Sequence, residues 1–177
     1  MAVLQSIKKL FVPKPEPAED VIVPAPRTTY SVKRLSIKDI DRLLRLNLRC
    51  FKQGENYTRH TFNYLLTQPQ SLGFAAETSL GELAGFVLLM NNQDGAAHIT
   101  TVGVAPEHRR RGVARRLIEE IENVLRKKSV STVVLEVRVS NKSAQDLYAR
   151  AGYSIVKRMA RYYHNGEDGF LMMKSLV

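Results

Sequence analysis

Hydrophobic and polar residues alternate along the chain in short blocks, and the period of the alternation changes from block to block. Over residues 132–139 the period is two, which puts Leu135 and Glu136 on opposite faces of a predicted strand. Between residues 113 and 125, apolar residues recur every three or four positions and form one helical stripe. The chain is therefore expected to combine strands and helices.

The same periods predict seven strands and four helices from residue 30 onward. Ser36 and Asp39 form a capping box at the start of the first helix. The apolar positions of that helix are Ile40, Leu43, Leu44 and Leu48. The predicted strands are residues 30–35, 73–78, 83–90, 97–104, 132–139, 153–163 and 170–176, and the other helices follow the polar stretch 52–60, begin at Val113 and cover 141–150. This order predicts an α/β sandwich with a mixed sheet.

The first 29 residues differ from the rest. Five of the seven prolines lie between positions 13 and 26, which fixes φ there and removes backbone donors. Residues 1–11 carry Val3, Leu4, Ile7 and Leu10 at helical spacing, typical either of a surface-binding helix or of a tail docked on its own domain or a neighbour. We expect an arm over residues 1–29 and one globular domain over 30–177.

The chain is strongly basic, with 27 Lys and Arg against 17 Asp and Glu and a formal net charge of +10. This charge suits a polyanionic partner such as a nucleotide cofactor, nucleic acid, a ribosomal surface or acidic lipid. The single cysteine, Cys50, excludes an internal disulfide, and the four histidines lack metal-ligand spacing, so we expect no metal. Because no apolar stretch is long enough to span a bilayer, we expect a soluble, cytoplasmic protein.

Residues 102–114 end a predicted strand and begin a helix, and three consecutive arginines, Arg109 to Arg111, stand at the junction. A helix N-terminus already carries partial positive charge and unpaired N–H groups, so arginines there repel one another and the helix dipole. A bound anion would remove this conflict. Gly112 has no Cβ, so a diphosphate could approach the backbone closely.

This junction resembles the pyrophosphate loop of GNAT-superfamily N-acetyltransferases, whose motif is matched by Arg109-x-x-Gly112-x-Ala114. The segment Leu-Glu-Val-Arg-Val-Ser-Asn at 135–141 follows, and then Ala144, Leu147, Tyr148, Gly152 and Tyr153. The resemblance covers residues 30–177 and implies the GNAT fold, a mixed central sheet flanked by helices in a three-layer sandwich, with acetyl-CoA as cosubstrate. It implies cofactor contacts from Val102, Gly103, Val104, Arg109, Arg110, Arg111, Gly112, Val113, Ala114 and Asn141.

Within the superfamily, the paired Tyr162 and Tyr163 followed by Gly-Glu-Asp at 166–168 are similar to the ending of RimI-type ribosomal-protein alanine N-acetyltransferases and of the catalytic subunits of N-terminal acetyltransferases. The resemblance implies that a protein or peptide N-terminus is the substrate, ribosomal proteins included, and that Tyr162 and Tyr163 line its groove. Because both fall in the strand predicted over 153–163, they should alternate, with only one pointing into the groove. Residues 50–57 occupy the place of the family's specificity loop but depart from the bacterial RimI pattern.

Acetyl transfer to an amine needs a neutral amine and a proton for the leaving thiolate. A peptide α-amine has a pKa near 8, so a carboxylate acting through a water can deprotonate it. Glu136 stands at the position of the RimI-type general base, although it could instead be a solvated residue beside Arg138. Tyr148 stands at the position of the general acid, although it could be a core tyrosine. Direct transfer in a ternary complex is expected, with Cys50 as a buried thiol and His98 as a sheet histidine.

Two other functions compete with this hypothesis. The first is a GNAT enzyme that acts on lysine or a small-molecule amine, which the Tyr-Tyr and Gly-Glu-Asp ending disfavours. The second is a non-catalytic basic adaptor for ribosome or RNA. The presence of Glu136 and Tyr148 disfavours an adaptor, and the sequence contains no aromatic-rich stacking motif for direct nucleic-acid readout.

Overall fold

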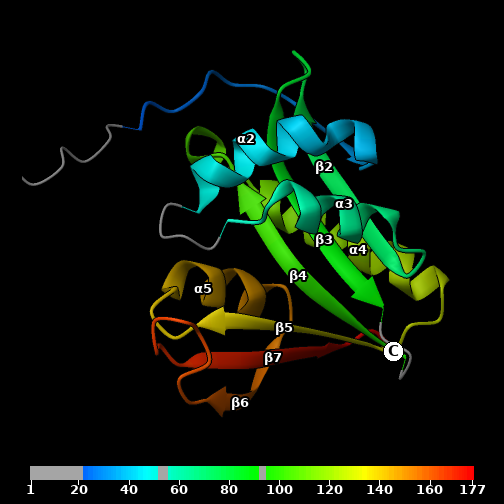
Figure 1. Ribbon diagram of the computed structural model, residues 1–177, viewed down its shortest axis with the longest axis vertical. Coiled ribbons are helices and arrows are strands. Elements are labelled where there is room, and N and C mark those ends of the chain that lie inside the picture. The colour runs from blue at the N-terminus through cyan, green and yellow to red at the C-terminus, as the bar shows by residue number, and fades with distance from the viewer. Residues whose placement is uncertain (1–21, 52–55, 92–94) are drawn as a thin grey trace, which may run out of the picture.

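The computed structural model describes residues 22–51, 56–91 and 95–177 (Figure 1). Its strands are β1 (Tyr30–Arg34), β2 (Ser71–Thr78), β3 (Leu83–Asn91), β4 (Ala96–Val104), β5 (Thr132–Arg138), β6 (Ser154–Met159) and β7 (Gly169–Ser175). Its helices are α2 (Ile40–Cys50), α3 (Arg59–Thr67), α4 (Val113–Lys127) and α5 (Lys142–Arg150), with short turns η2 (Ile37–Asp39) and η3 (Pro106–His108). The predicted order of elements is confirmed.

The strands form one seven-stranded sheet in the order β1-β2-β3-β4-β5-β7-β6. All neighbouring strands are antiparallel except β4 and β5, which are parallel, so the sheet is mixed as expected. Only three residue pairs join β4 to β5, from Ala96 with Thr132 to His98 with Val134. Beyond them the two strands diverge, as Figure 1 shows, and the sheet opens in its middle.

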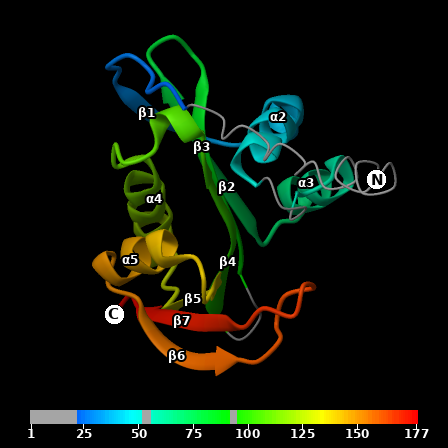
Figure 2. The ribbon, with the colours of Figure 1, turned by 90° about the vertical axis from the view of Figure 1, so that its left-hand side faces the viewer.

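Helices cover both faces of the sheet (Figure 2). The apolar stripe of α4 is buried in one hydrophobic cluster, which also receives α5 and the inward face of β5. The second cluster lies under α2 and α3 on the opposite face, with Phe62 and Phe86 fully buried there. The two clusters and the sheet between them make the three-layer sandwich that the resemblance implied.

The capping box predicted at Ser36 and Asp39 is present, and it opens η2, which leads into α2. One predicted apolar position of α2 is wrong, because Leu48 is 61% exposed whereas Leu46 is buried. At about 100° per residue, Leu48 lies roughly 140° around the helix from the fully buried Leu43. It therefore points to solvent.

The strand predicted over residues 153–163 is shorter in the structure, where β6 ends at Met159. Arg161 then adopts a positive φ of 50°, and its N–H donates to the Asp168 carboxylate, which closes the chain into a turn. Tyr162 and Tyr163 consequently lie in the β6–β7 connection, so the expectation that they alternate along a strand is wrong.

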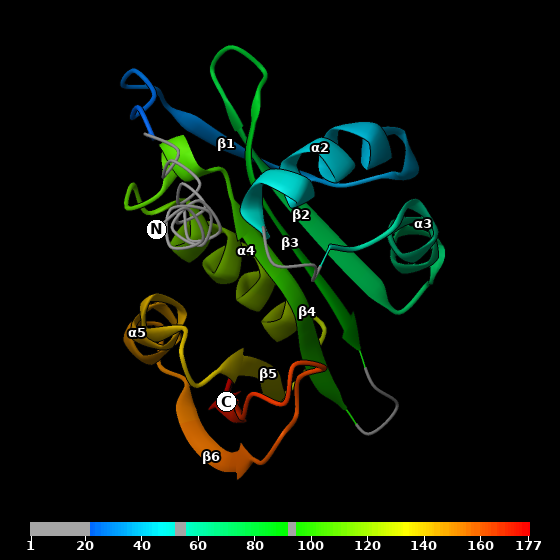
Figure 3. The ribbon, with the colours of Figure 1, turned by 60° about the vertical axis from the view of Figure 1, so that its left-hand side comes forward.

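Residues 22–29 run in extended form past the β4–α4 connection to the start of β1 (Figure 3). We call residues 22–29 the strap. The amphipathic turn expected over residues 1–11, and most of the proline-rich stretch, lie outside the described residues.

Candidate active site

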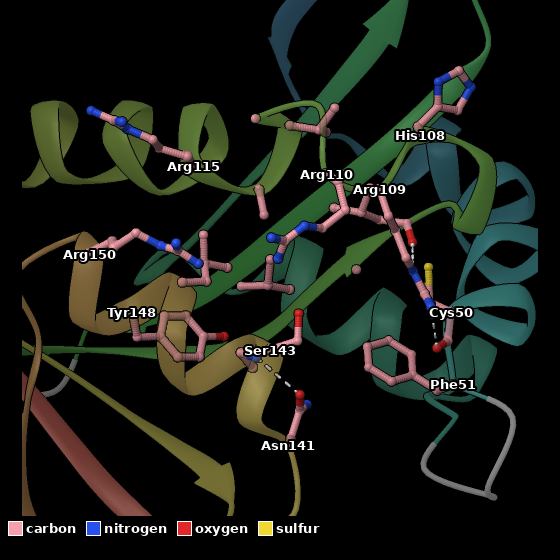
Figure 4. A pocket seen from close by; sticks show the side chains of 18 residues that line it. Cys50, Phe51, His108, Arg109, Arg110, Arg115, Asn141, Ser143, Tyr148 and Arg150 are labelled. Atoms are coloured by element: carbon pink, nitrogen blue, oxygen red, sulfur yellow. Dashed lines mark hydrogen bonds between the residues drawn. The ribbon is translucent and has the colours of Figure 1, made fainter. Parts of the chain in front are cut away.

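A cavity of about 640 Å³ opens where β4 diverges from β5, between the first turn of α4 and α5 (Figure 4). It brings together nine of the ten predicted cofactor residues, namely Val102, Gly103, Val104, Arg109, Arg110, Gly112, Val113, Ala114 and Asn141. Tyr148 lines the same cavity. Other lining residues, among them Cys50, Phe51, Ser143 and Arg150, were not singled out by sequence as contributors to it.

The first turn of α4 begins without a side-chain cap. Its N-cap, Gly112, has a positive φ of 78°, and a Cβ built there would meet no protein atom within 4 Å. The helix starts α3 and α5, in contrast, are capped by the side chains of Thr58 and Asn141. The backbone N–H groups at the start of α4 are thus left facing the cavity, as an anion site requires.

The side chains of the three arginines before Gly112 have different surroundings. Arg109 braces the loop, because its Nε donates to the carbonyl of Val104 at 3.2 Å and its Nη2 to that of Cys50 at 3.4 Å. Arg110, whose φ is 61°, extends into the cavity. Arg111 does not line the cavity; its guanidinium donates to backbone carbonyls of the strap. The cofactor contact expected from Arg111 stays a prediction, and the structure shows its guanidinium bound to the strap.

Packing against Phe86 requires a glycine at position 103 of β4. A Cβ there would lie 2.5 Å from the ring of the fully buried Phe86, a separation that real Cβ atoms do not show. A larger residue would therefore displace that ring or the strand. Because Gly103 has no side chain, the backbone of β4 itself forms the cavity wall at this position.

Asn141, the N-cap of α5, and Tyr148 within α5 both line the cavity. Asn141 caps the helix, since its Oδ1 accepts from the N–H of Ala144 at 3.1 Å. Tyr148 is 8% exposed and packs edge-on against Tyr153. Burial raises the pKa of Tyr148 well above its usual range, so the hydroxyl keeps its proton at neutral pH. Among the described residues, no group hydrogen-bonds this hydroxyl.

Glu136 has a partner that sequence reasoning did not find. Its Oε2 lies 2.5 Å from Nε2 of His98, on the neighbouring strand. The parallel register pairs His98 with Val134, so Glu136 follows two residues later on the same face of β5. Both side chains remain partly exposed, at 31% for His98 and 20% for Glu136. The carboxylate is thus held by a sheet histidine and still accessible.

Three tyrosines surround this carboxylate, and we call Tyr57, His98, Glu136, Tyr162 and Tyr163 the tyrosine cluster. The hydroxyl of Tyr57 donates to the carbonyl of Thr100 at 3.0 Å. Burial raises the pKa of each tyrosine, that of Tyr163 to about 12, and the nearby Glu136 carboxylate adds to each increase. The rings of Tyr162 and Tyr163 meet edge to face at 5.2 Å.

The Gly-Glu-Asp segment anchors the loop that carries Tyr162 and Tyr163. Glu167 accepts from the N–H of Ser140 at 2.9 Å and from Arg138 at 2.6 Å, and these bonds lower its pKa to about 2. The guanidinium of Arg138 also lies 3.8 Å from the centre of the Tyr163 ring. The loop is therefore fastened to the end of β5, two residues from Glu136.

The predicted site residues thus fall into two adjoining groups, the cavity and the tyrosine cluster. Both groups flank the opening between β4 and β5, because Tyr148 lines the cavity there and Glu136 lies two residues beyond the last β4–β5 pair. The sequence placed His98 in a strand, but only the register between β4 and β5 reveals its contact with Glu136. Tyr57 had no signal beyond its place in the expected specificity loop.

No group of three or more His, Cys, Asp or Glu side chains within residues 22–51, 56–91 and 95–177 could hold a metal ion. In the same ranges, no helix is long and apolar enough to cross a membrane.

Comparison with known proteins gives the class. The model of the acetyltransferase (GNAT) family matches residues 40–153, which is more than half of the chain. The protein belongs to the GNAT family and is an acetyltransferase.

Three curated relatives are named for N-terminal acetylation. The N-alpha-acetyltransferase of Sulfurisphaera tokodaii is 27% identical over 159 residues, covering 83% of this chain and 93% of the relative. N-alpha-acetyltransferase daf-31 of Caenorhabditis elegans is 30% identical and covers 83% of both chains. The catalytic subunit NAA10 of the N-terminal acetyltransferase A complex of Arabidopsis thaliana is 32% identical, covering 82% of this chain and 77% of the relative.

Solved structures agree on the fold. The ribosomal-protein-S18-alanine N-acetyltransferase from Escherichia coli matches with a TM-score of 0.76 at 25% identity, over 84% of this chain and 94% of that one. Ard1 from Thermoplasma volcanium also matches with a TM-score of 0.76, at 23% identity, over 84% of this chain and 98% of that one.

Proposed function

We propose that the protein transfers the acetyl group of acetyl-CoA to the α-amine of a protein or peptide N-terminus, by direct transfer in a ternary complex. The observation that carries this proposal is the adjacency of the cavity and the tyrosine cluster at the opening between β4 and β5. One group suits a long anionic cosubstrate, and the other suits an amine. The names of the curated relatives support the same reaction.

The cavity residues fit acetyl-CoA. The uncapped start of α4 offers N–H groups to a diphosphate, and the open space above Gly112 lets it approach them. Arg110 points into the cavity, where it would add salt-sensitive attraction. Along β4, the backbone from Val102 to Val104 has no paired strand on the β5 side and can bond the amides of the pantetheine arm.

Glu136 would act as general base. His98 holds one carboxylate oxygen, which leaves the other to accept a proton through a water from the incoming ammonium. An α-amine with a pKa near 8 needs only modest help at neutral pH. The neutral nitrogen then attacks the thioester carbonyl carbon to give a tetrahedral intermediate, and the nitrogen releases its second proton to solvent as the C–S bond breaks. The proton taken up at Glu136 also leaves with solvent.

Tyr148 would act as general acid at the departing sulfur. Its buried hydroxyl lines the cavity and stays protonated at neutral pH, so it can donate to the thiolate and be reprotonated from solvent. Tyr162 and Tyr163 would hold the first residues of the substrate chain beside Glu136, since Glu167 and Arg138 fix their loop.

The test is acetyl-CoA turnover on peptides that vary in their first two residues. Controls are peptides with a blocked N-terminus and one internal lysine, and a free polyamine. The proposal expects acetylation of free N-termini only. Turnover on blocked lysine peptides or on the polyamine alone would establish the lysine or small-amine alternative, and acetyl-CoA binding without any turnover would favour an adaptor.

A further inference from the structure

The strap is fastened to the loop that begins α4. The N–H of Ala25 donates to the carbonyl of Glu107 at 3.1 Å. In return, Arg111 donates through Nη1 to the carbonyl of Pro26 at 2.9 Å and through Nη2 to that of Ala25. Two adjacent residues of the strap therefore make three hydrogen bonds to the loop (Figure 3).

Further contacts hold the C-terminal end of the strap and the residue that follows it. Thr28 shares a hydrogen bond of 3.0 Å with Ser79 in the β2–β3 turn. Just after the strap, the Tyr30 hydroxyl lies 3.0 Å from Nδ1 of the buried His108, and the Tyr30 carbonyl accepts from Arg116 of α4 at 3.2 Å. The strap is thus tied to the sheet on one side and to the loop on the other.

The backbone conformation of the loop explains why the Arg111 side chain can reach the strap. Its neighbours Arg110 and Gly112 both have positive φ, at 61° and 78°. Positive φ at a non-glycine residue such as Arg110 is costly and persists only when its surroundings enforce it. The resulting path sends the Arg110 side chain into the cavity and the Arg111 side chain out to the strap.

We propose that Arg111 is a positioning residue for cosubstrate binding: by gripping the strap, it keeps the Glu107–Gly112 loop in the shape that exposes the α4 N–H groups and Arg110 to the diphosphate. The proposal rests on the proposed acetyl-CoA site. Arg111 itself does not touch the ligand, and its charge is not needed there. Binding of CoA and docking of the strap are therefore thermodynamically coupled.

The experiment is a double-mutant cycle in the full chain, read by calorimetric titration with CoA. Arg111→Gln removes the grip, and Ala25→Pro removes the single N–H that the strap donates to the loop. Lys127→Gln, at the other end of α4, is the control for lost charge. Each of the two variants should raise the dissociation constant of CoA about fivefold, at the low end of usual coupling factors. The double variant should raise it no further than the more affected of the two single variants.

Steady-state kinetics distinguish a role of Arg111 in cosubstrate binding from a role in the chemical step. The KM for acetyl-CoA should rise in both variants by about the same factor as the dissociation constant, with kcat at saturation within roughly twofold of the wild type. If Arg111→Gln weakens CoA binding while Ala25→Pro does not, or if the two effects multiply, Arg111 acts directly on the ligand and the inference is wrong. Failure of the wild type to bind CoA would instead overturn the proposed function.

A second measurement does not depend on either variant folding. By reciprocity, saturating CoA should slow hydrogen exchange of the Ala25 amide about fivefold, because binding stabilises the loop that this amide bonds. Unchanged exchange at Ala25, with CoA bound, would contradict the coupling.

Discussion

Nε2 of His98, in the last residue pair that joins β4 to β5, lies 2.5 Å from Oε2 of Glu136, two residues beyond that pair on β5. The position of the candidate base is therefore set by a side chain from a different strand, at the point where the sheet opens. A carboxylate on a strand can swing among rotamers, and a fixed partner on one oxygen selects one of them.

Replacing His98 should affect turnover more than cosubstrate binding. We expect His98→Ala to lower kcat by between about ten- and a hundredfold, the cost of a misplaced reacting group, with the KM for acetyl-CoA little changed. His98→Gln retains a donor near the same place and should recover part of the loss. Steady-state kinetics with a preferred peptide measure both. Equal losses in the two variants would show that the hydrogen bond to Glu136 is not the cause.

Glu136→Gln removes the base but keeps the shape of the side chain. The rate at neutral pH should fall by about 10² to 10⁴, the usual contribution of general acid–base catalysis. The deficit should shrink at high pH, where the amine loses its proton unaided. The matched control is Glu82→Gln, in the β2–β3 turn away from the site. A loss below about threefold would remove Glu136 from the mechanism.

Tyr148→Phe should slow turnover by a similar order while leaving CoA affinity nearly unchanged, because only the hydroxyl of the proposed general acid is lost. Tyr153→Phe is the control, since its ring packs against Tyr148 at 5.9 Å but does not line the cavity. Single-turnover rates and calorimetry with CoA distinguish the two effects. Equal rates in both variants would make Tyr148 a core tyrosine.

Gly112 and Gly81 form a natural pair for a test of the anion site. Their φ angles are 78° and 79°, and a Cβ at either meets no protein atom within 4 Å. Changing either to alanine should cost about 1 kcal/mol of stability from the left-handed backbone. Gly112→Ala should also weaken CoA binding, and Gly112→Trp should abolish it, whereas Gly81→Ala leaves it intact. CoA affinity unchanged in Gly112→Trp would falsify the assignment.

The lowered pKa of Glu167, about 2, gives a pH dependence with a definite sign. A carboxylate with a folded-state pKa below its usual 4.5 contributes stability that is present above pH 4.5 and is lost as the pH falls toward 2. Urea unfolding should therefore show wild type more stable than Glu167→Gln at pH 6, with the difference vanishing near pH 2. A constant difference across this range would mean that the ionised carboxylate is not responsible.

Much of the fold could be predicted because it depends on local pattern. The stripe of α4 and the alternation of β5 determine which faces are buried, and Ser36 with Asp39 marks a helix start independently of the rest of the chain. Leu48 was misassigned because four leucines in α2 exceed what one helix face can bury, and packing decides which one is exposed.

The directions of individual side chains in the site could not be predicted in this way. The three arginines before α4 look alike in sequence, but a left-handed backbone at Arg110 separates them. The contact of His98 with Glu136 depends on a register between strands more than 30 residues apart, and the end of β6 depends on the carboxylate of Asp168, just before β7. Each of these is a tertiary relationship.

The interrupted pairing of β4 with β5 also has a consequence for heat stability. A ligand that hydrogen-bonds to the free edge of β4 binds only the folded state, so its binding adds to the free energy of unfolding. At a hundredfold excess over its dissociation constant this amounts to about 2.7 kcal/mol, or roughly 5–10 °C in melting temperature for a chain of this size. The ratio of unfolded to folded enzyme would then fall about a hundredfold at that excess of acetyl-CoA, and heat or urea would unfold the loaded enzyme later than the free one.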